Sequence, residues 1–220
     1  MGPSLAAMKD NSAQPTAIQP GQSCPVTGLI RGEDGVFRPG WANTEELACY
    51  YDTEWGISAC GSGAAALTHL SENALFERLC LESFQAGLSW ATILRKRPAL
   101  RQAFHNFDVD QVAAMDDDDV ASLMDNPAIL RNRAKIQAVI GNARATIALR
   151  AHGGLGEFMA PYCPPPAPAP RCVDEIASRS AESAALAKAL KEKGFSFVGP
   201  TTMYALFQAL GVVNDRVPAP

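Results

Sequence analysis

The sequence lacks the long apolar runs and leader features that mark membrane and secreted proteins. No apolar stretch among its 220 residues approaches the roughly 18 residues that span a bilayer. The first residues also lack the basic stretch and apolar core of a secretory signal. We therefore expect a protein without a membrane partner that resides in the cytoplasm.

Paired metal ligands are absent as well. The six cysteines contain no CxxC pair, and the three histidines lie far from one another in the sequence. Structural zinc sites normally bring their ligands in such closely spaced pairs. The sequence therefore predicts neither a bound metal nor another cofactor.

Basic residues are not in excess, since 19 Lys and Arg face 23 Asp and Glu for a net charge of −4. This balance argues against a protein that coats nucleic acid through bulk charge. Basic residues nevertheless gather in residues 95–101 and 131–144, whereas acidic residues gather in 116–119. Such separation permits a local phosphate-binding face, although most charge runs are simply solvated helix surfaces.

Composition divides the chain into two parts. Residues 1–38 are rich in Gly, Pro, Ser, Ala and Gln and show little apolar periodicity, which predicts a flexible N-terminal extension. We expect the functional domain to cover residues 39–217. A proline-rich stretch at 164–170 within that domain favours an extended, stiff connector.

Apolar residues in the domain recur at helical spacing. Helices are predicted at 71–85 behind a Ser71 cap, from Trp90 with a boundary at Pro98, at 109–115 behind Asp108, and at 120–124, 130–150, 183–193 and 201–210. No segment shows convincing strand alternation. The sequence therefore predicts an all-α fold.

A short glycine-bounded loop joins the last two predicted helices. Gly194 and Gly199 enclose four residues, and glycines permit tight turns and close approach of the backbone to a ligand. Amides at the start of the second helix can bind a DNA phosphate, with further contacts from Lys193, Thr201 and Thr202. The alternative is an ordinary connection between helices, and the loop alone does not decide between them.

Aromatic residues and one carboxylate form a second cluster. A flipped, positively charged purine needs an aromatic slot and a hydrogen-bond acceptor, which Trp41, Tyr50, Trp90 and Glu82 are able to supply. The alternative is that the aromatics are core residues and the glutamate lies on a solvated helix face. Residue types alone favour this second interpretation.

Four motifs together point to a known family. They are EWG at 54–56, LE at 81–82 with QAGLSW at 85–90, KIQAVIGNARA at 135–145, and GFSFVG at 194–199. In this order, over residues 40–217, the chain resembles the type I 3-methyladenine DNA glycosylases (TAG). The resemblance implies a helix-hairpin-helix glycosylase fold, with the hairpin at about 183–211.

The same resemblance assigns roles to individual residues. It implies that Glu82 reads the excised base, that Tyr50 and Trp90 stack on or contact it, and that Trp41 helps to form the pocket. Gly87 and Leu88 correspond to the tip that fills the gap left in the duplex. Trp55 is expected to give structural support.

The resemblance also implies an activity. The protein is expected to flip and excise 3-methyladenine from double-stranded alkylated DNA, leave an abasic site, and act as a monomer. Bifunctional members of the superfamily carry a lysine after the hairpin, and Thr201 stands near that place in this sequence. We therefore expect base release without strand cleavage.

The sequence departs from the family in two respects. Many members have a zinc ion that ties the two chain ends together, but Pro39, Tyr51, Arg216 and Pro220 occupy the matching places here. None of these replaces a thiolate or imidazole ligand, so we expect a zinc-free protein. Leu47 stands where the family often has a pocket tyrosine.

These departures keep other functions open. One is a non-catalytic, lesion-sensing DNA-binding module, and another is a glycosylase for a different alkylated base, including a bulky adduct. A third is a helical scaffold that never contacts DNA. Loss of binding with rising salt distinguishes a DNA-binding hairpin from this last possibility.

Overall fold

The computed structural model describes residues 18–59 and 61–220, and within them the fold is all-α, as predicted. Ten α-helices and one two-stranded sheet form this part of the chain. The helices are α1 Glu45–Thr53, α2 Ala64–Thr68, α3 Glu72–Gln85, α4 Trp90–Ala103, α5 Val109–Ala114, α6 Asp117–Asp125, α7 Arg133–Leu149, α8 Gly154–Met159, α9 Ala181–Glu192 and α10 Pro200–Leu210. Short 3-10 segments lie at His105–Phe107, Arg150–His152, Ala160–Tyr162 and Val173–Glu175. No helix in this part of the chain is long and apolar enough to cross a membrane.

Side-chain caps fix where several helices begin. The hydroxyl of Ser71 accepts a hydrogen bond from the amide of Ala74, and the carboxylate of Asp108 accepts one from the amide of Gln111. Each cap satisfies an amide that has no partner inside the helix, which contributes about 1 kcal/mol. The predicted starts of α3 and α5 are therefore confirmed.

The predicted boundary at Pro98 is wrong, because Pro98 lies inside α4. A proline removes one helical hydrogen bond and crowds the preceding turn at a cost of about 3 kcal/mol. Ile93 and Leu100, on either side of it, are fully buried in the core. Burial of these two side chains offsets the cost and keeps the helix continuous.

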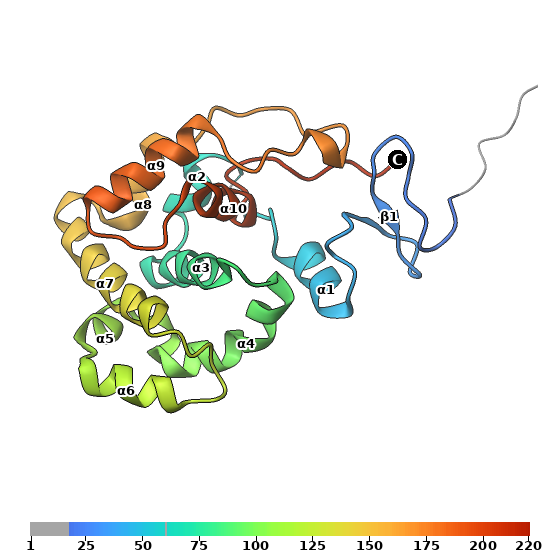
Figure 1. Ribbon diagram of the computed structural model, residues 1–220. Coiled ribbons are helices and arrows are strands. Elements are labelled where there is room, and N and C mark those ends of the chain that lie inside the picture. The colour runs from blue at the N-terminus through green and yellow to red at the C-terminus, as the bar shows by residue number, and fades with distance from the viewer. Residues whose placement is uncertain (1–17, 60) are drawn as a thin grey trace, which may run out of the picture.

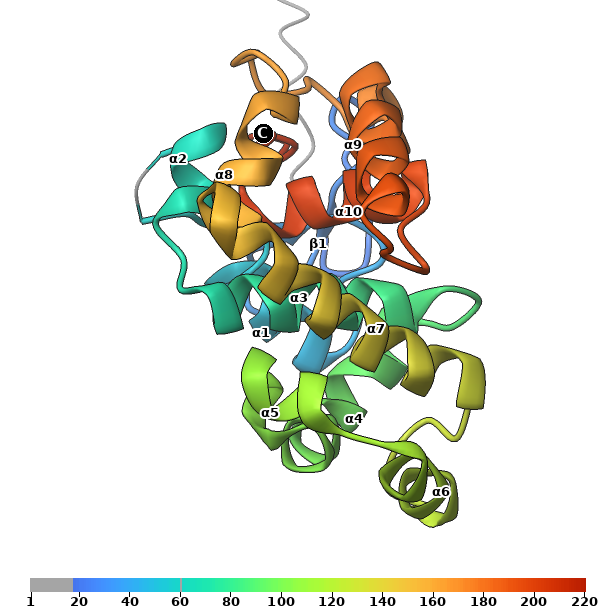
Figure 2. The ribbon, with the colours of Figure 1, turned by 90° about the vertical axis from the view of Figure 1, so that its left-hand side faces the viewer.

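Helix α3 runs through the centre of the molecule (Figure 1), with α9 and α10 on one side and α4 to α6 on the other. Figure 2 shows the same order from a perpendicular direction. Leu75 and Leu79 of α3 belong to a core shared with α2, α8, α9 and α10. Phe76, Cys80 and Phe84 belong to a second core shared with α4 to α7. Since both cores use α3, this helix holds its side chains in fixed positions between the two halves.

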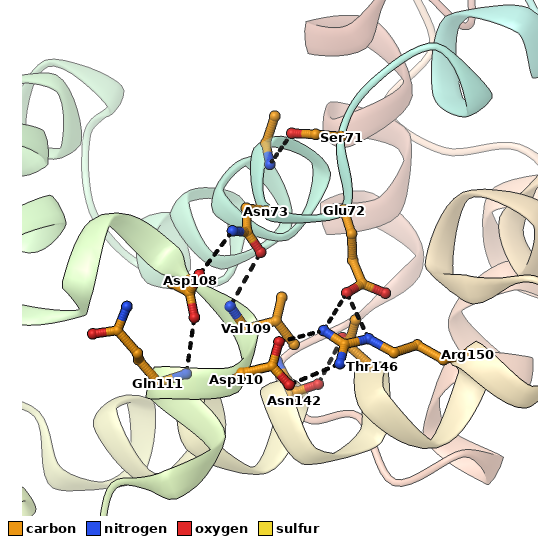
Figure 3. A network of polar contacts seen from close by, with 11 residues as sticks. Ser71, Glu72, Asn73, Asp108, Val109, Asp110, Gln111, Asn142, Thr146 and Arg150 are labelled. Carbon is orange, nitrogen blue, oxygen red and sulfur yellow. Dashed lines mark hydrogen bonds and ion pairs between the residues drawn. The ribbon is translucent and has the colours of Figure 1, made fainter.

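Polar contacts join the start of α3 to the neighbouring helices (Figure 3). Arg150, just after α7, pairs with Glu72 of α3 at 2.6 Å and with Asp110 of α5 at 2.7 Å. Asn73 donates to the carboxylate of Asp108 and accepts from the first amide of α5. Because the guanidinium is partly exposed, these pairs contribute at most about 1 kcal/mol each, and they mainly fix helix orientation.

The N-terminal segment differs from the flexible extension predicted from its composition. Residues 1–17 lie outside the described residues, but β1 (Ile30–Arg31) and β2 (Phe37–Arg38) pair antiparallel. Cys24 and Leu29 of this segment are buried. Each strand has two residues, too few to produce an alternating pattern in the sequence.

We call residues 19–38 the N-terminal hairpin; it lies beyond α1 at the right of Figure 1. Arg38 donates to the carboxylates of Asp34, within the hairpin, and Asp52, on α1. Arg38 is 9% exposed, whereas the side chains of Asp34 and Asp52 remain 51% and 34% exposed, so these charge-assisted bonds are only partly shielded from water. The hairpin is therefore attached to the helix that carries Tyr50.

Candidate active site

A cavity of about 720 Å³ opens where α1, α3, α4 and α10 meet. Its volume lies in the range typical of small-molecule sites. The lining includes Pro39, Trp41, Leu47, Tyr50, Trp55, Glu82, Gln85, Ser89, Trp90, Val173, Ile176, Ala177, Ser178, Thr201 and Gln208. The structure thus brings together the four predicted base-binding residues, which lie up to 49 positions apart in the sequence, counting from Trp41 to Trp90.

Glu82 comes from the central helix and is 5% exposed. Burial raises the pKa of its carboxyl group from 4.5 to about 8, because a charged carboxylate loses hydration there; the nearby Arg78 opposes part of this rise. The carboxyl is therefore mostly neutral at pH 7 in the free protein. A cationic ligand in the cavity would favour the ionised form and pair with it.

Aromatic rings form the wall beside Glu82. The ring centroids of Tyr50 and Trp90 are 5.3 Å apart, and Trp41 lies 6.5 Å from Tyr50 and 5.5 Å from Trp55. Within the described residues, the Tyr50 hydroxyl and the Trp90 indole nitrogen are buried without a hydrogen-bond partner. Buried donors normally have partners, so these two atoms are suited to bind a ligand.

The predicted tip follows directly after α3. Gly87 adopts a φ of +79°, a conformation that favours glycine, and Leu88 remains 41% exposed. Lys135 of α7 donates from its Nζ atom to the carbonyls of Phe84 at 2.8 Å and Ala86 at 2.6 Å. The loop that exposes Leu88 is therefore held by a buried cation within a few residues of Glu82.

The glycine-bounded loop joins α9 to α10 as predicted. Gly194 has a φ of +92° and ends α9, while Phe195 and Val198 are buried beneath the loop. No side chain in the described structure caps α10 at Gly199, so its first amides remain available for an anion. Lys193 and Thr201 are exposed and Thr202 is half-buried at this end of the helix pair.

Helix α7 also holds this second loop. The side chain of Asn142 accepts from the amide of Ser196 at 2.8 Å and donates to its carbonyl at 3.1 Å. Asn142 is fully buried, so its side chain is shielded from water, while Ser196 itself lies at the surface. Helix α7 therefore binds the tip through Lys135 and the glycine-bounded loop through Asn142.

Comparison with known families agrees with this arrangement. The family model described as methyladenine glycosylase matches residues 41–219. The chain belongs to the methyladenine glycosylase family. The resemblance inferred from the four motifs is thereby confirmed.

Curated proteins similar to the chain carry matching names. DNA-3-methyladenine glycosylase 1 of Escherichia coli (strain K12) is 42% identical over 184 residues, which cover 82% of this chain and 93% of that protein. DNA-3-methyladenine glycosylase of Haemophilus influenzae is 38% identical, covering 76% of this chain and 87% of that protein. The similarity therefore extends over nearly the whole length of both relatives.

Solved structures of the family share the fold. A crystal structure of 3-methyladenine DNA glycosylase I has a TM-score of 0.72 at 40% identity, covering 80% of this chain and 93% of that one. A Staphylococcus aureus structure, described as the basis of 3-methyladenine recognition, has a TM-score of 0.71 at 30% identity. It covers 80% of this chain and 89% of its own.

Several lining residues of this methyladenine glycosylase were not expected from the sequence. Trp55, predicted as structural support, packs on Trp41 and also lines the cavity. Gln208 of α10 lines it too, and its amide donates to Asp215 at 2.8 Å. Residues 173–178 form another wall after the proline-rich stretch. These positions lie in a loop or on a buried helix face, where periodicity carries no signal for a site.

The places that match the family's zinc site do not fit a metal ion in this chain. In the described residues, no three His, Cys, Asp or Glu side chains group closely enough to hold one. Instead the guanidinium of Arg216 lies 4.0 Å from the ring centroid of Tyr51 and donates to the carbonyls of Tyr51 and Trp55. A cation–π contact and two hydrogen bonds thus join the C-terminal segment to α1.

Proposed function

We propose that this methyladenine glycosylase excises 3-methyladenine from alkylated double-stranded DNA and binds the flipped base in the cavity beside Glu82. The observation that carries the proposal is a buried carboxyl group next to two aromatic residues whose polar atoms lack partners in the described structure. The names of the relatives and of the solved neighbours support the same base. Family membership makes the protein a hydrolase of N-glycosidic bonds.

The charge of the lesion explains how binding becomes catalysis. Methylation at N3 makes adenine a cation, so the base is already a good leaving group and needs little protonation. Glu82 ionises to pair with this cation, whereas neutral adenine gains no such pairing. The rings of Tyr50 and Trp90 add contact with the positively charged base.

Bond cleavage follows without a covalent enzyme intermediate. The glycosidic C–N bond breaks, its electron pair leaves with the base, and an oxocarbenium-like sugar remains. Water adds to the sugar and loses a proton, which leaves an abasic site. Thr201 has no amine with which to form a Schiff base, so we expect the DNA strand to stay intact.

Contacts with the duplex are assigned to the two loops held by α7. Leu88, exposed beside Gly87, is suited to fill the space that the flipped base leaves. The uncapped start of α10, with Gly194, Gly199, Lys193, Thr201 and Thr202 around it, is suited to hold a phosphate. Weak pairing of the lesion lowers the cost of flipping, which is a few kcal/mol.

The base cavity and both loops come from a single chain, so we expect a monomer to be active. Light scattering at the concentration used in the activity assay measures this directly. A dimer mass at that concentration would contradict the expectation.

The deciding experiment is chromatography of free bases released from methylated duplex DNA, with no metal added. We expect the intact protein to release 3-methyladenine, and Glu82→Gln to lose activity by about 100-fold or more, since it loses the negative charge. Glu46→Gln, at an exposed position on α1, serves as the control and should be fully active. Strand breaks are scored in the same reactions.

Contrary results have clear meanings. Absence of base release together with tight binding to abasic DNA would replace the proposal with a non-catalytic lesion-sensing module. Release of 3-methyladenine that Glu82→Gln leaves unchanged would remove the carboxylate from its assigned role. Strand incision at a rate comparable to base release would contradict the monofunctional assignment.

A second candidate, excision of a larger alkylated base, is favoured by the lining and the volume of the cavity. Leu47 is buried in its wall and offers an apolar surface without a hydrogen bond. The volume of about 720 Å³ lies in the upper half of the range for small-molecule sites, which leaves room for a bulkier ligand. Duplexes carrying a bulky N3-alkyl adenine test it: release faster than that of 3-methyladenine would support the larger substrate.

A further inference from the structure

An irregular loop forms one wall of the base cavity. Val173, Ile176, Ala177 and Ser178 line the cavity, yet they belong to a connection whose regular part is the 3-10 turn Val173–Glu175. The ion pair at this turn, between Arg171 and Glu175, is local and largely solvent-exposed. An exposed local pair contributes little rigidity, so the position of the wall depends on what packs behind it.

The N-terminal hairpin packs behind this wall. The amide of Val173 donates to the carbonyl of Thr27 at 2.9 Å. Gly28, the next residue, has a φ of +72°, and a methyl group built on it would lie only 2.5 Å from Cγ2 of Val173. The absence of a side chain at Gly28 therefore allows the hairpin backbone to rest directly on the side chain of Val173.

The hairpin is fixed on its other sides. The turn before Gly28 closes through hydrogen bonds between Cys24 and Leu29 at 2.7 Å and between Gly28 and Cys24 at 2.8 Å. Arg38 ties the second strand to Asp52 of α1. The chain then continues into Pro39 and Trp41, which line the cavity themselves. The hairpin thus touches one wall of the cavity and leads directly into another.

The family match starts at residue 41, so the hairpin precedes the part of the chain that the family describes. We propose that this added hairpin is part of the base site: it sets the position of the 173–178 wall through the contact of Gly28 with Val173, and so tunes base affinity and selectivity. The inference rests on the proposed function, because it concerns the same cavity.

The test compares two glycines of the hairpin with similar backbone angles. Gly28→Ala places a methyl group against Val173, whereas Gly21→Ala, at a φ of +78°, meets no described atom within 4 Å. Because their φ angles are close, both substitutions carry similar backbone strain, on the order of 1–2 kcal/mol, and they differ mainly in the contact with Val173. We expect Gly28→Ala to raise the KM for 3-methyladenine in DNA and the Kd of free 3-methyladenine by about 3- to 10-fold. Gly21→Ala should change neither by more than about twofold.

Repeating the Gly28→Ala substitution in a Val173→Ala variant isolates the contact between residues 28 and 173. Val173→Ala removes the Cγ atoms that the new methyl group would strike, so adding Gly28→Ala to it should change KM by less than about twofold. Equal effects of Gly28→Ala in both backgrounds, or equal KM values for the two single glycine variants, would overturn the proposal.

If Gly28→Ala does not fold, Arg38→Ala provides the second arm. This variant releases the hairpin from α1 at its other attachment and should also raise KM, with kcat nearly unchanged; an unchanged KM would overturn the proposal. The two proposals fail differently. A wild-type protein that releases no 3-methyladenine overturns the proposed function and this inference with it. An active wild type whose KM is unchanged in the Gly28→Ala and Arg38→Ala variants overturns the inference alone.

Discussion

Two buried ionisable side chains, Lys135 and Glu82, have different environments. Lys135 is 8% exposed, and two backbone carbonyls accept hydrogen bonds from its ammonium group. Glu82 is buried as deeply but lies in the wall of the cavity. The charge of Lys135 therefore holds a loop, whereas we propose that the carboxyl group of Glu82 ionises to pair with a cationic ligand. Burying this carboxyl group has a cost to the folded state.

That cost predicts how stability changes with pH. The pKa of Glu82 is about 8 in the folded protein and 4.5 in its ordinary environment, so the unfolded state releases this proton first as pH rises. The contribution of Glu82 to stability therefore falls between about pH 4.5 and pH 8. Glu82→Gln cannot ionise and escapes this loss.

We expect Glu82→Gln to gain stability over the wild type by an amount that grows between these pH values, reaching on the order of 2–5 kcal/mol at pH 8. Thermal unfolding from pH 4 to pH 8.5 measures the difference. A constant difference in Tm across the range would show that the carboxyl is not perturbed.

The ionisation of Glu82 should affect activity in the opposite direction, so that activity rises over the pH range in which stability falls. Pairing with a cationic base requires ionised Glu82, so kcat/KM for 3-methyladenine in DNA should rise with pH up to about 8 and then level off. Initial rates at low substrate concentration give this profile. A profile that is flat from pH 6 to pH 8 would contradict the role of Glu82 in the free enzyme.

At the scale of elements, α7 connects the two loops assigned to DNA. Its Lys135 holds the carbonyls before Gly87, and its Asn142 holds Ser196 in the hairpin loop. A rigid helix fixes the distance between these two attachments. We therefore expect α7 to hold the tip and the phosphate site at a fixed spacing, so that both loops contact the same DNA duplex.

Asn142→Ala tests this role. It removes both hydrogen bonds to Ser196 and should raise the KM for duplex DNA about 3- to 10-fold, with a loss of about 1–3 kcal/mol of stability. The affinity for free 3-methyladenine should stay unchanged, because the base cavity is intact. Gln137→Ala, on the exposed face of α7, is the matched control. Equal weakening of DNA and free-base binding would indicate a general structural defect.

At the scale of the whole molecule, Arg216 brings the C-terminal segment to α1. Its guanidinium lies on the Tyr51 ring and donates to the carbonyls of Tyr51 and Trp55, in the last turn of α1 and just after it. A partly buried cation–π contact with such bonds contributes about 1–2 kcal/mol. These contacts occupy the places where the family often has zinc ligands.

We expect Arg216→Ala to lower the Tm by several degrees and EDTA to leave the wild-type Tm and activity unchanged. Arg216→Lys should recover only part of the loss, because an ammonium group is unable to make the same planar contact. Differential scanning calorimetry with and without chelator measures both effects. A fall in Tm on adding EDTA would reveal a metal that contributes to stability.

Much of the architecture was accessible from local patterns. Ser71 and Asp108 were predicted as caps because their side chains act on amides only a few residues away. Pro98 was misread as a boundary, because its cost is offset by burial of Ile93 and Leu100 against distant helices. The composition of residues 1–38 does not predict the N-terminal hairpin, because the hairpin is held by a bond from Arg38 to Asp52 and by contact with Val173, and both partners lie outside that segment.

By itself, the sequence determined the helical class, the glycine-bounded loop at residues 194–199 and, through four ordered motifs, the family. These features depend on periodicity, on turn residues and on short strings, all of which are local. Only the tertiary structure decided that Glu82 is buried beside Tyr50 and Trp90, that Val173 and residues 176–178 line the same cavity, and that the N-terminal hairpin packs behind Val173. Burial and pKa depend on which distant segments exclude water from a group, and that is fixed only when the chain has folded.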